Sequence, residues 1–444
     1  MGMDLGKTRV SQRQIFRLWL PLETAWLLMA VEGPFVAAIL ARLPDPVCNL
    51  GVFGVACGFA WVFESPIILI MSAVTALVEN RDSLRRLRTF TYALNGAVTL
   101  GLALFVLPPV FTLVTGTIMG LPPEIIRLAH PACVLLLPWP SAIGYRRFYQ
   151  GILVRSGLTR RVTYGTALRL SVMGGTAVLL ATVTRLPGAL VGSCALSAGV
   201  MAEAVASRFW ARELVRQLLA TAPSPEYRRA PLTYRGIAIF YLPLALTSLL
   251  AVGVNPLVSF FLGRARMSLE SLAVMPVVNG LAFAFNTAGL TFQEVAIPMF
   301  GRDWRNFRPL RRFAGWLALV TAGGMTLMVA TPLMGLWLEQ VAGLGPALAR
   351  FAWLPVALVT LLPPITVGTC FQRALLVVRR TTRPITWASA VELGGIGAVL
   401  FLLTRVCGWV GAVAAVSAMV AGRLAAMLFL LPRSTRALRS SGKA

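Results

Sequence analysis

The stretch Leu20-Pro21-Leu22 lies in strongly apolar sequence near the start of the chain, and it recurs 222 residues later as Leu242-Pro243-Leu244. Further positions agree at the same offset: Leu27-Leu28 with Leu249-Leu250, Pro34 with Pro256, Val36 with Val258, Leu40 with Leu262, Arg42 with Arg264, Gly58 with Gly280, Ala60 with Ala282, Phe63 with Phe285, Gln150 with Gln372 and Leu153 with Leu375. The chain therefore contains two homologous halves. In a membrane protein such a repeat is typical of a secondary transporter, whose two lobes rock about a site near the middle of the bilayer.

The composition places the chain in a membrane. Hydrophobic residues make up 57% of the sequence and charged residues only 13%, and the mean hydropathy is +0.77. A water-soluble core cannot absorb that much apolar surface, so the bilayer must serve as the solvent. Apolar segments long enough to span it occur at about 16–41, 50–78, 90–112, 128–152, 163–184, 188–207, 236–263, 270–300, 313–337, 350–377, 384–404 and 408–432. We therefore predict an all-α polytopic protein with about twelve transmembrane helices.

The cationic residues are distributed unevenly along the chain, whose net charge is +25. They gather before the first expected span and after the second, fourth, sixth, eighth, tenth and twelfth, whereas the alternate loops carry few. Because lysine and arginine are retained in the cytoplasm, this pattern predicts that both termini are cytoplasmic, in a bacterial-type inner membrane. The charge is explained by topology and by anionic lipids at the cytoplasmic face, and nucleic acid is not expected as a partner.

The boundary between the halves is expected in the polar stretch Thr221-Ala-Pro-Ser-Pro-Glu-Tyr-Arg-Arg229, whose prolines prevent a continuous helix. We predict an N-terminal six-helix lobe at residues 1–222, a cytoplasmic linker at 223–235 and a C-terminal six-helix lobe at 236–444. Six spans in each half make the repeats parallel, related by an axis along the membrane normal. The protein is expected to be a monomer.

Several kinds of chemistry find no support in the sequence. His130 is the only histidine and the six cysteines show no paired spacing, which argues against a metal site, and no cofactor is expected. The phosphate-binding pattern GxxxxGK[ST] is absent, so transport must draw on an ion or substrate gradient. The patterns HExxH and GxSxG are also absent, which argues against an enzyme.

Short motifs along the chain resemble one superfamily of transporters. The 6+6 arrangement, the proline-interrupted first helix of each half and the motif Tyr149-Gln-Gly-Ile-Leu-Val-Arg155-Ser-Gly157 resemble the multidrug and toxin extrusion (MATE) group of the multidrug/oligosaccharidyl-lipid/polysaccharide (MOP) flippase superfamily. Pro243-Leu-Ala-Leu246, Pro256-Leu-Val258, Phe63-Glu-Ser-Pro66 and Asn80-Arg-Asp82 are similar to the progressive ankylosis protein family. The resemblance implies two pseudo-symmetric lobes about a V-shaped cavity, and export of anionic metabolites such as nucleotides, citrate or pyrophosphate.

Acidic and amide residues inside the expected spans are candidates for binding a substrate or ion. A charge at a helix centre costs roughly 2.5–3.5 kcal/mol on insertion scales, so such residues avoid lipid. Glu32 precedes Pro34, which frees a backbone carbonyl and bends the helix, and Pro256 is expected to kink the seventh helix likewise. Glu23 is expected instead to pair with Arg13 or Arg17. Further candidates are Glu64 and Asn286, which occupy equivalent positions, together with Asn255 and Glu294.

Each of these candidates also has a purely structural interpretation. Glu64 and Asn286 could make ordinary helix–helix hydrogen bonds, which are worth only about 0.6 kcal/mol in membranes. Glu294 lies close enough in sequence to Arg302 and Arg305 for a structural ion pair. The sequence leaves both interpretations open.

Deep arginines form a second group of candidates. Arg146 and Gln150 share a helix face through their i,i+4 spacing, and Gln150 corresponds in the repeat to Gln372, which lies beside Arg373. Together with Arg147, these side chains suit an anionic substrate, because guanidinium groups bind carboxylates and phosphates bidentately. The alternative is snorkelling of the arginines to the cytoplasmic interface. Arg169 and Glu392 lie at nearly equivalent positions and are expected in separate networks within each lobe.

The family resemblance and the deep arginines favour a secondary transporter that works by alternating access and exports an organic anion; the resemblance implies one like a nucleotide, citrate or pyrophosphate. A membrane potential negative inside favours anion export by about 2.3 kcal/mol per charge per 100 mV. One alternative is proton- or sodium-coupled multidrug efflux through Glu32 and Glu64. A lipid-linked precursor flippase and, in another class, a membrane-embedded enzyme or assembly factor remain as further alternatives.

Overall fold

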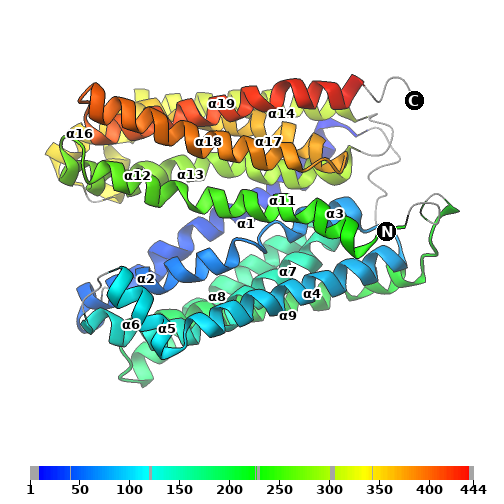
Figure 1. Cartoon of the computed structure of the whole chain (residues 1–444), viewed down its shortest axis with the longest axis horizontal. Coiled ribbons are helices and arrows are strands. Elements are labelled where there is room, and N and C mark those ends of the chain that lie inside the picture. The colour runs from blue at the N-terminus through cyan, green and yellow to red at the C-terminus, as the bar shows by residue number, and fades with distance from the viewer. Residues whose placement is uncertain are drawn as a thin grey trace. The chain divides into compact units, whose positions relative to one another are not determined.

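The computed structural model describes residues 10–40, 42–119, 123–225, 227, 231–300, 306–342 and 344–439. Among them all regular secondary structure is helical, apart from an isolated bridge between Arg266 and Val410. Long helices run side by side in each part of the molecule (Figure 1). The predicted all-α fold is confirmed.

The described residues of each apolar segment expected from the sequence are mainly helical, with short breaks inside several of them. The first half contains α1 (Gln12–Leu40), α2 (Pro46–Glu64), α3 (Ile70–Leu77), α4 (Arg81–Phe105), α5 (Pro108–Thr112), the π-helical turn η1 (Leu113–Ile118), α6 (Pro123–Leu135), α7 (Pro138–Arg155), α8 (Thr159–Val183) and α9 (Gly188–Ala220). The second half contains α11 (Tyr234–Val252), α12 (Val254–Leu262), α13 (Ser268–Met299), α14 (Phe307–Ala330), α15 (Leu333–Gly335), η2 (Leu336–Val341), α16 (Pro346–Val359), α17 (Leu362–Val378), α18 (Arg383–Phe401), η3 (Leu402–Val406) and α19 (Gly411–Arg439).

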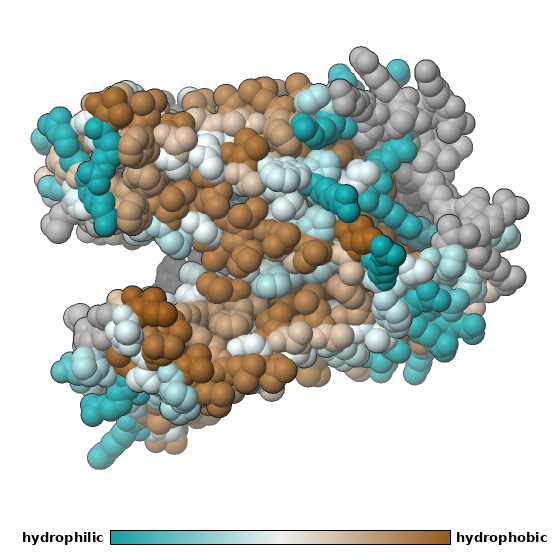
Figure 2. Space-filling view, viewed as in Figure 1, coloured by the Kyte–Doolittle hydropathy of each residue, from teal (hydrophilic) through white to brown (hydrophobic). Residues whose placement is uncertain are grey.

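The protein is a multi-pass membrane protein. In the described residues, nine helices are long and apolar enough to cross a bilayer, or ten if α4 and the α5–η1 segment, bent by 71°, form one span. Hydrophobic side chains gather along the middle of the helices and hydrophilic ones at their ends (Figure 2). The count of twelve spans, the V-shaped cavity and the cytoplasmic position of both termini stay predictions.

The chain forms two compact units, and one helix from each half of the sequence is divided between them. Among the described residues, unit 1 comprises Thr24–Ser248. Unit 2 comprises the residues up to Glu23 and those from Leu249 onward. In unit 2 the indole of Trp19 on α1 donates a hydrogen bond to the carbonyl of Ala288 on α13 (3.1 Å). In unit 1 the hydroxyl of Tyr241 on α11 donates to the carbonyl of Pro66 (2.7 Å). The first helix of each sequence half therefore divides between the two units.

The prolines of these two helices have different effects. The seventh expected span divides at Gly253, so that Pro256 lies in the first turn of α12, where a missing N–H does no harm. The first expected span is one continuous helix, α1, although Pro34 lies within it. The proline break expected in both halves is thus present in the second half alone. The side chain of Pro34 lies outside the described residues.

The repeat seen in the sequence extends to the packing of the helices. A Cβ atom placed on Gly199 of α9 would lie 2.9 Å from the carbonyl oxygen of Arg169 on α8. A Cβ atom placed on Gly422 of α19 would lie 2.8 Å from the carbonyl oxygen of Glu392 on α18. Both pairs are related by an offset of 223 residues. Small residues of this kind let membrane helices approach closely, so the same helix contact is built twice.

We expect Gly199→Ala to lower the thermal melting temperature of the purified protein. The added methyl group meets backbone, and overpacking typically costs about 1–3 kcal/mol. Gly175→Ala on α8 is the matched control, because a Cβ atom there meets nothing within 4 Å. A helical glycine replaced by alanine without a clash gains about 0.5–1 kcal/mol. Equal melting temperatures for the two variants would contradict the close packing at Gly199.

The expected orientation can be tested by cysteine labelling. Cys407 is exposed after η3, in a loop predicted to be external. An impermeant maleimide should label it in intact cells. In a Cys407→Ser background, Arg85→Cys in the first turns of α4 should be labelled only in inside-out vesicles. Labelling of Arg85→Cys in intact cells would reverse the predicted topology.

Candidate functional site

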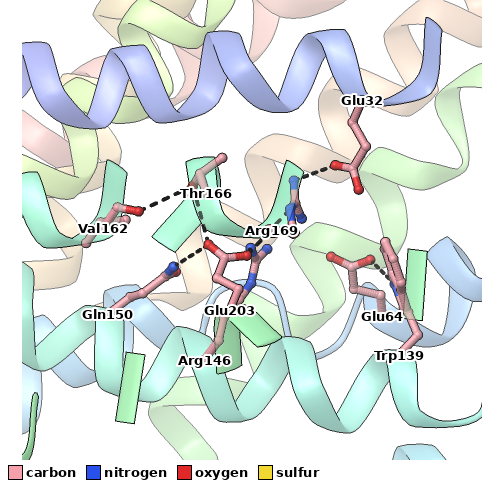
Figure 3. Close-up of polar contacts among 9 residues, drawn as sticks. All are labelled: Glu32, Glu64, Trp139, Arg146, Gln150, Val162, Thr166, Arg169 and Glu203. Carbon is pink, nitrogen blue, oxygen red and sulfur yellow. Dashed lines mark hydrogen bonds and ion pairs between the residues drawn. The ribbon is translucent and has the colours of Figure 1, made fainter. Parts of the chain in front are cut away.

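A buried carboxylate lies at the centre of a polar cluster in unit 1. Glu203 on α9 is fully buried and forms an ion pair with Arg146 on α7. Its other carboxylate oxygen accepts hydrogen bonds from Gln150 Nε2 (3.1 Å) and Thr166 Oγ1 (3.3 Å). Arg169 Nε lies 3.5 Å from Glu203 Oε2. Figure 3 shows these groups converging on Glu203 from α7 and α8. Arg146, Glu203 and Arg169 are called the unit 1 triad below.

Arg169 connects this triad to α1. Its Nη2 atom donates to Glu32 Oε2, so its guanidinium lies between two carboxylates, Glu32 and Glu203 (Figure 3). Among the described residues, the second carboxylate oxygen of Glu32, Oε1, is buried without a hydrogen-bond partner. The ion pairs of the cluster join two arginines to two glutamates and are therefore electrically balanced.

Helical spacing explains why these side chains lie on the same faces of their helices. Arg146 and Gln150 are four residues apart on α7, and Thr166 and Arg169 are three apart on α8, so each pair lies on one helix face. Three helices thus direct polar groups at one point inside an apolar unit. Such a network is stable only if its members satisfy one another, because unpaired polar groups are costly away from water.

The remaining candidates of unit 1 make separate contacts. Glu64 accepts a hydrogen bond from Trp139 Nε1 (2.8 Å). The guanidinium of Arg147 lies over the ring of Trp26, 5.6 Å from its centroid. The structure therefore brings Arg146, Gln150 and Glu32 into one network, and it leaves Glu64 and Arg147 in neighbouring contacts.

Unit 2 contains a second network. Glu392 on α18 accepts a hydrogen bond from Arg423 Nε on α19 (3.0 Å) and lies 3.8 Å from Arg373 Nη2 on α17. Arg423 Nη1 also donates to Thr366 Oγ1 (3.0 Å), which donates to Asn286 Oδ1 (2.9 Å). Arg373, Glu392 and Arg423 are called the unit 2 triad below.

The two triads lie on helices that are equivalent in the repeat, but the acid and one of the bases have exchanged helices. Arg169 on α8 and Glu392 on α18 are equivalent at the 223-residue offset. The acid of unit 1, Glu203, corresponds to Ala426, and the base Arg423 of unit 2 corresponds to Val200. Each unit therefore holds one carboxylate between two arginines, but the acid lies on α9 in the first unit and on α18 in the second.

The triads also differ in exposure. Side-chain exposure in the unit 1 triad is at most 2%. In the unit 2 triad it is 12% for Glu392, 20% for Arg373 and 27% for Arg423. The side chains of the first triad are buried, whereas those of the second are partly exposed.

Other candidates of unit 2 lie on the neighbouring helices. Gln372 is buried beside Arg373, and its Oε1 atom has no hydrogen-bond partner among the described residues. Glu294 is half-buried on α13, the helix that carries Asn286. Asn255 and Pro256 are exposed on α12.

Glu23 has different partners from those expected. Its carboxylate accepts hydrogen bonds from Thr287 (2.7 Å) and Thr291 (2.6 Å) of α13. The expected pairing with Arg13 or Arg17 is wrong, because the first half of α1 packs against unit 2 and turns this carboxylate into that unit.

Four members of the triads are not among the predicted site residues: Glu203, Arg169, Glu392 and Arg423. The available signal was electrostatic: each deep arginine needs an acid at the same depth on a neighbouring helix. The near-equivalence of Arg169 and Glu392 was the visible part of that signal. Which helices are neighbours is a property of the fold.

Solved structures match nearly the whole chain, although no protein-family model and no curated protein matches it. A MOP superfamily transporter from Pyrococcus furiosus aligns with a TM-score of 0.76 and 14% identity over 98% of both chains. A mutant of the Vibrio cholerae MATE transporter VcmN aligns with a TM-score of 0.69 and 15% identity over 97% of both chains. The eukaryotic MATE transporter AtDTX14 gives a TM-score of 0.72 and 13% identity over 97% of both chains.

The fold is accordingly that of MATE transporters and their relatives in the MOP superfamily. This confirms the wider of the two resemblances seen in the sequence, at the level of the fold. The narrower resemblance to the progressive ankylosis family stays a prediction.

We expect Glu203→Gln to destabilise the protein by about 3–5 kcal/mol, because removing the acid of a buried ion pair leaves uncompensated charge. Glu213→Gln on the same helix is the matched control. Glu213 pairs with Arg216 at 3.6 Å, but their side chains are 60% and 75% exposed. An exposed pair contributes about 0–1 kcal/mol. Thermal melting in detergent should separate the two variants, and equal melting temperatures would contradict a structural role for the unit 1 triad.

Proposed function

We propose that the protein is a secondary transporter that exports a small organic anion by alternating access. The observation that carries this proposal is the unit 2 triad, in which two arginines share one carboxylate inside apolar helices. Partly exposed charges in membrane-spanning segments avoid lipid and face water-filled space. Guanidinium groups there suit a carboxylate or phosphate, since their forked N–H groups match its oxygens.

The repeat and the fold support transport in general. Two homologous halves can alternate between two arrangements about a shared axis, which opens a site to each side of the membrane in turn. The similar solved structures are transporters, and that from Pyrococcus furiosus has a binding pocket of reverse polarity that suggests a different function for it. A basic site in the present chain fits an anionic substrate.

Export of an anion requires no coupled ion. A membrane potential negative inside favours outward movement of a negative charge by about 2.3 kcal/mol per 100 mV. Two negative charges double this driving force. A carrier for such a substrate needs only to bind it and to change its access.

Cation-coupled drug efflux is the second candidate, and Glu32 favours it. One oxygen of this carboxylate has no partner among the described residues, and such an oxygen can accept a proton or contact a cation. Its other oxygen already accepts a hydrogen bond from Arg169. The arginine offsets the charge that a coupling cation would recognise, so the anion proposal is preferred.

Transport into inside-out vesicles tests the choice. We expect labelled citrate or ADP to accumulate when the lumen is made electrically positive, and we expect Arg423→Gln to abolish accumulation. Arg216→Gln, at the exposed pair on α9, is the control and should transport normally. Dye extrusion driven by protons, retained in Arg423→Gln and lost in Glu32→Gln, would overturn the proposal in favour of cation-coupled efflux.

A further inference from the structure

We propose that unit 1 binds the phosphate group of an anionic phospholipid at a site formed by Arg88 and Tyr92 on α4 and Arg208 on α9. These three residues are called the headgroup cluster below. The cluster shares no residue with either triad, so the inference does not depend on which substrate the protein carries.

The basic ends of α4 and α9 lie together. The backbone N–H of Arg81, at the start of α4, donates a hydrogen bond to the carbonyl of Thr221, just after α9 (3.2 Å). The two helices run side by side from this junction (Figure 1). Tyr92 is eleven residues beyond Arg81, and Arg208 is thirteen before Thr221. At 1.5 Å per residue they lie about 17 and 20 Å from the junction, which is nearly the same depth.

A buried tyrosine of α7 connects the members of the cluster. The hydroxyl of Tyr149 shares a hydrogen bond with the hydroxyl of Tyr92 (2.8 Å). The guanidinium of Arg208 lies over the ring of Tyr149, 5.1 Å from its centroid. Arg88 shares a helix face with Tyr92 through i,i+4 spacing and interacts electrostatically with its hydroxyl. Both guanidinium groups therefore interact with one pair of hydrogen-bonded tyrosines.

The cluster offers donors that the described part of the chain does not use. Arg86 on α4 donates to the carbonyl of Leu232 (2.6 Å), whereas neither Arg88 nor Arg208 has an ion pair or hydrogen bond with a described residue. A guanidinium stacked on a ring keeps the N–H groups in its own plane, and these match the oxygens of a phosphate. When the buried tyrosine donates the bond between the two hydroxyls, the proton of Tyr92 is a further donor.

The position of the cluster along the helices is that of lipid headgroups. The expected spans begin at about residue 90 and end at about residue 207, so Arg88 and Arg208 flank them and Tyr92 lies just inside. Arginine and tyrosine are typical of this level. One and two turns deeper on the same face of α9, Val205 and Met201 are 71% and 48% exposed. An acyl chain can pack on these side chains while its phosphate contacts the arginines.

The charge of the cluster selects the class of lipid. Two guanidinium groups attract a lipid whose headgroup carries a net negative charge, such as phosphatidylglycerol. The headgroup of phosphatidylcholine adds a cation, which the arginines repel. We therefore expect the site to prefer the anionic lipid.

The repeat shows that the fold does not require this cluster. Leu84-Arg85-Arg86 on α4 recurs as Leu310-Arg311-Arg312 on α14, at an offset of 226 residues. The same offset places Ala314 and Ala318 at the positions of Arg88 and Tyr92. At the 223-residue offset of the last helices, Leu431 replaces Arg208. Unit 2 thus has the equivalent helices without the equivalent polar groups, and it serves as a control inside the same molecule.

The first test is a lipid titration of the purified full-length protein, followed by native mass spectrometry. We expect Arg88→Gln combined with Arg208→Gln to weaken phosphatidylglycerol binding by about tenfold or more and to leave phosphatidylcholine binding unchanged. Arg85→Gln combined with Arg216→Gln removes the same charge from exposed positions of the same two helices and is the matched control. Equal weakening by both pairs would mean a response to overall charge and would overturn the inference.

The second test locates the lipid on the native protein, so it decides by itself if the first pair of substitutions prevents folding. Phosphatidylglycerol with a photoreactive acyl chain should label α9 around Met201 and Val205 more than α19 around Leu424 and Leu428. These leucines are the equivalent residues of unit 2 and are also exposed, at 39% and 55%. Equal labelling of the two helices by this lipid would overturn the inference.

A competition experiment distinguishes a lipid from a free oxyanion. Inorganic phosphate has the charge of the headgroup but no acyl chain to pack on α9. We expect it not to displace phosphatidylglycerol at an equal concentration. Displacement by inorganic phosphate would show that the headgroup cluster binds a soluble oxyanion, and the assignment to a lipid would be wrong.

Discussion

Inside a bilayer no bulk water solvates a charge, so each buried guanidinium or carboxylate must find its partner within the protein. This constraint organises both units. In unit 1 it ties α7 and α8 to α9 through Glu203, and α8 to α1 through Arg169. In unit 2 it ties α17 and α19 to α18 through Glu392. The apolar packing around them is less specific, because lipid can replace one apolar contact with another.

Close helix approach makes these ion pairs possible. Gly199 and Gly422 admit the backbone of the neighbouring helix at the turns that carry Arg169 and Glu392. The side chains that leave these turns then need to cross only a short distance to an acid or base on the adjacent helix. The glycine contact and the ion pair are therefore parts of one arrangement, repeated once in each half.

The fold could be read from the sequence because its signals are local or periodic. Apolar segments of spanning length and matches such as Pro34 with Pro256 depend only on residues near one another or at a fixed offset. The contacts of the site could be predicted from the sequence only in part. The shared face of Arg146 and Gln150 followed from helical spacing, but their acid, Glu203, is on α9. Which acid pairs with Arg146 depends on which helices lie next to each other in the fold. The wrong prediction of a partner for Glu23 has the same cause.

Exchange of charge between repeats gives two equivalent structures different chemistry. An ion pair retains its attraction when acid and base change places, so a repeat can reverse the pair between the last two helices of a unit without losing its fold. What changes is the set of partners around the reversed pair. Arg169 on α8 also pairs with Glu32 on α1, whereas Glu392 on α18 pairs with arginines on α17 and α19. Reversal of one pair thus gives two units of equivalent fold a different arrangement of charges on the same set of helices.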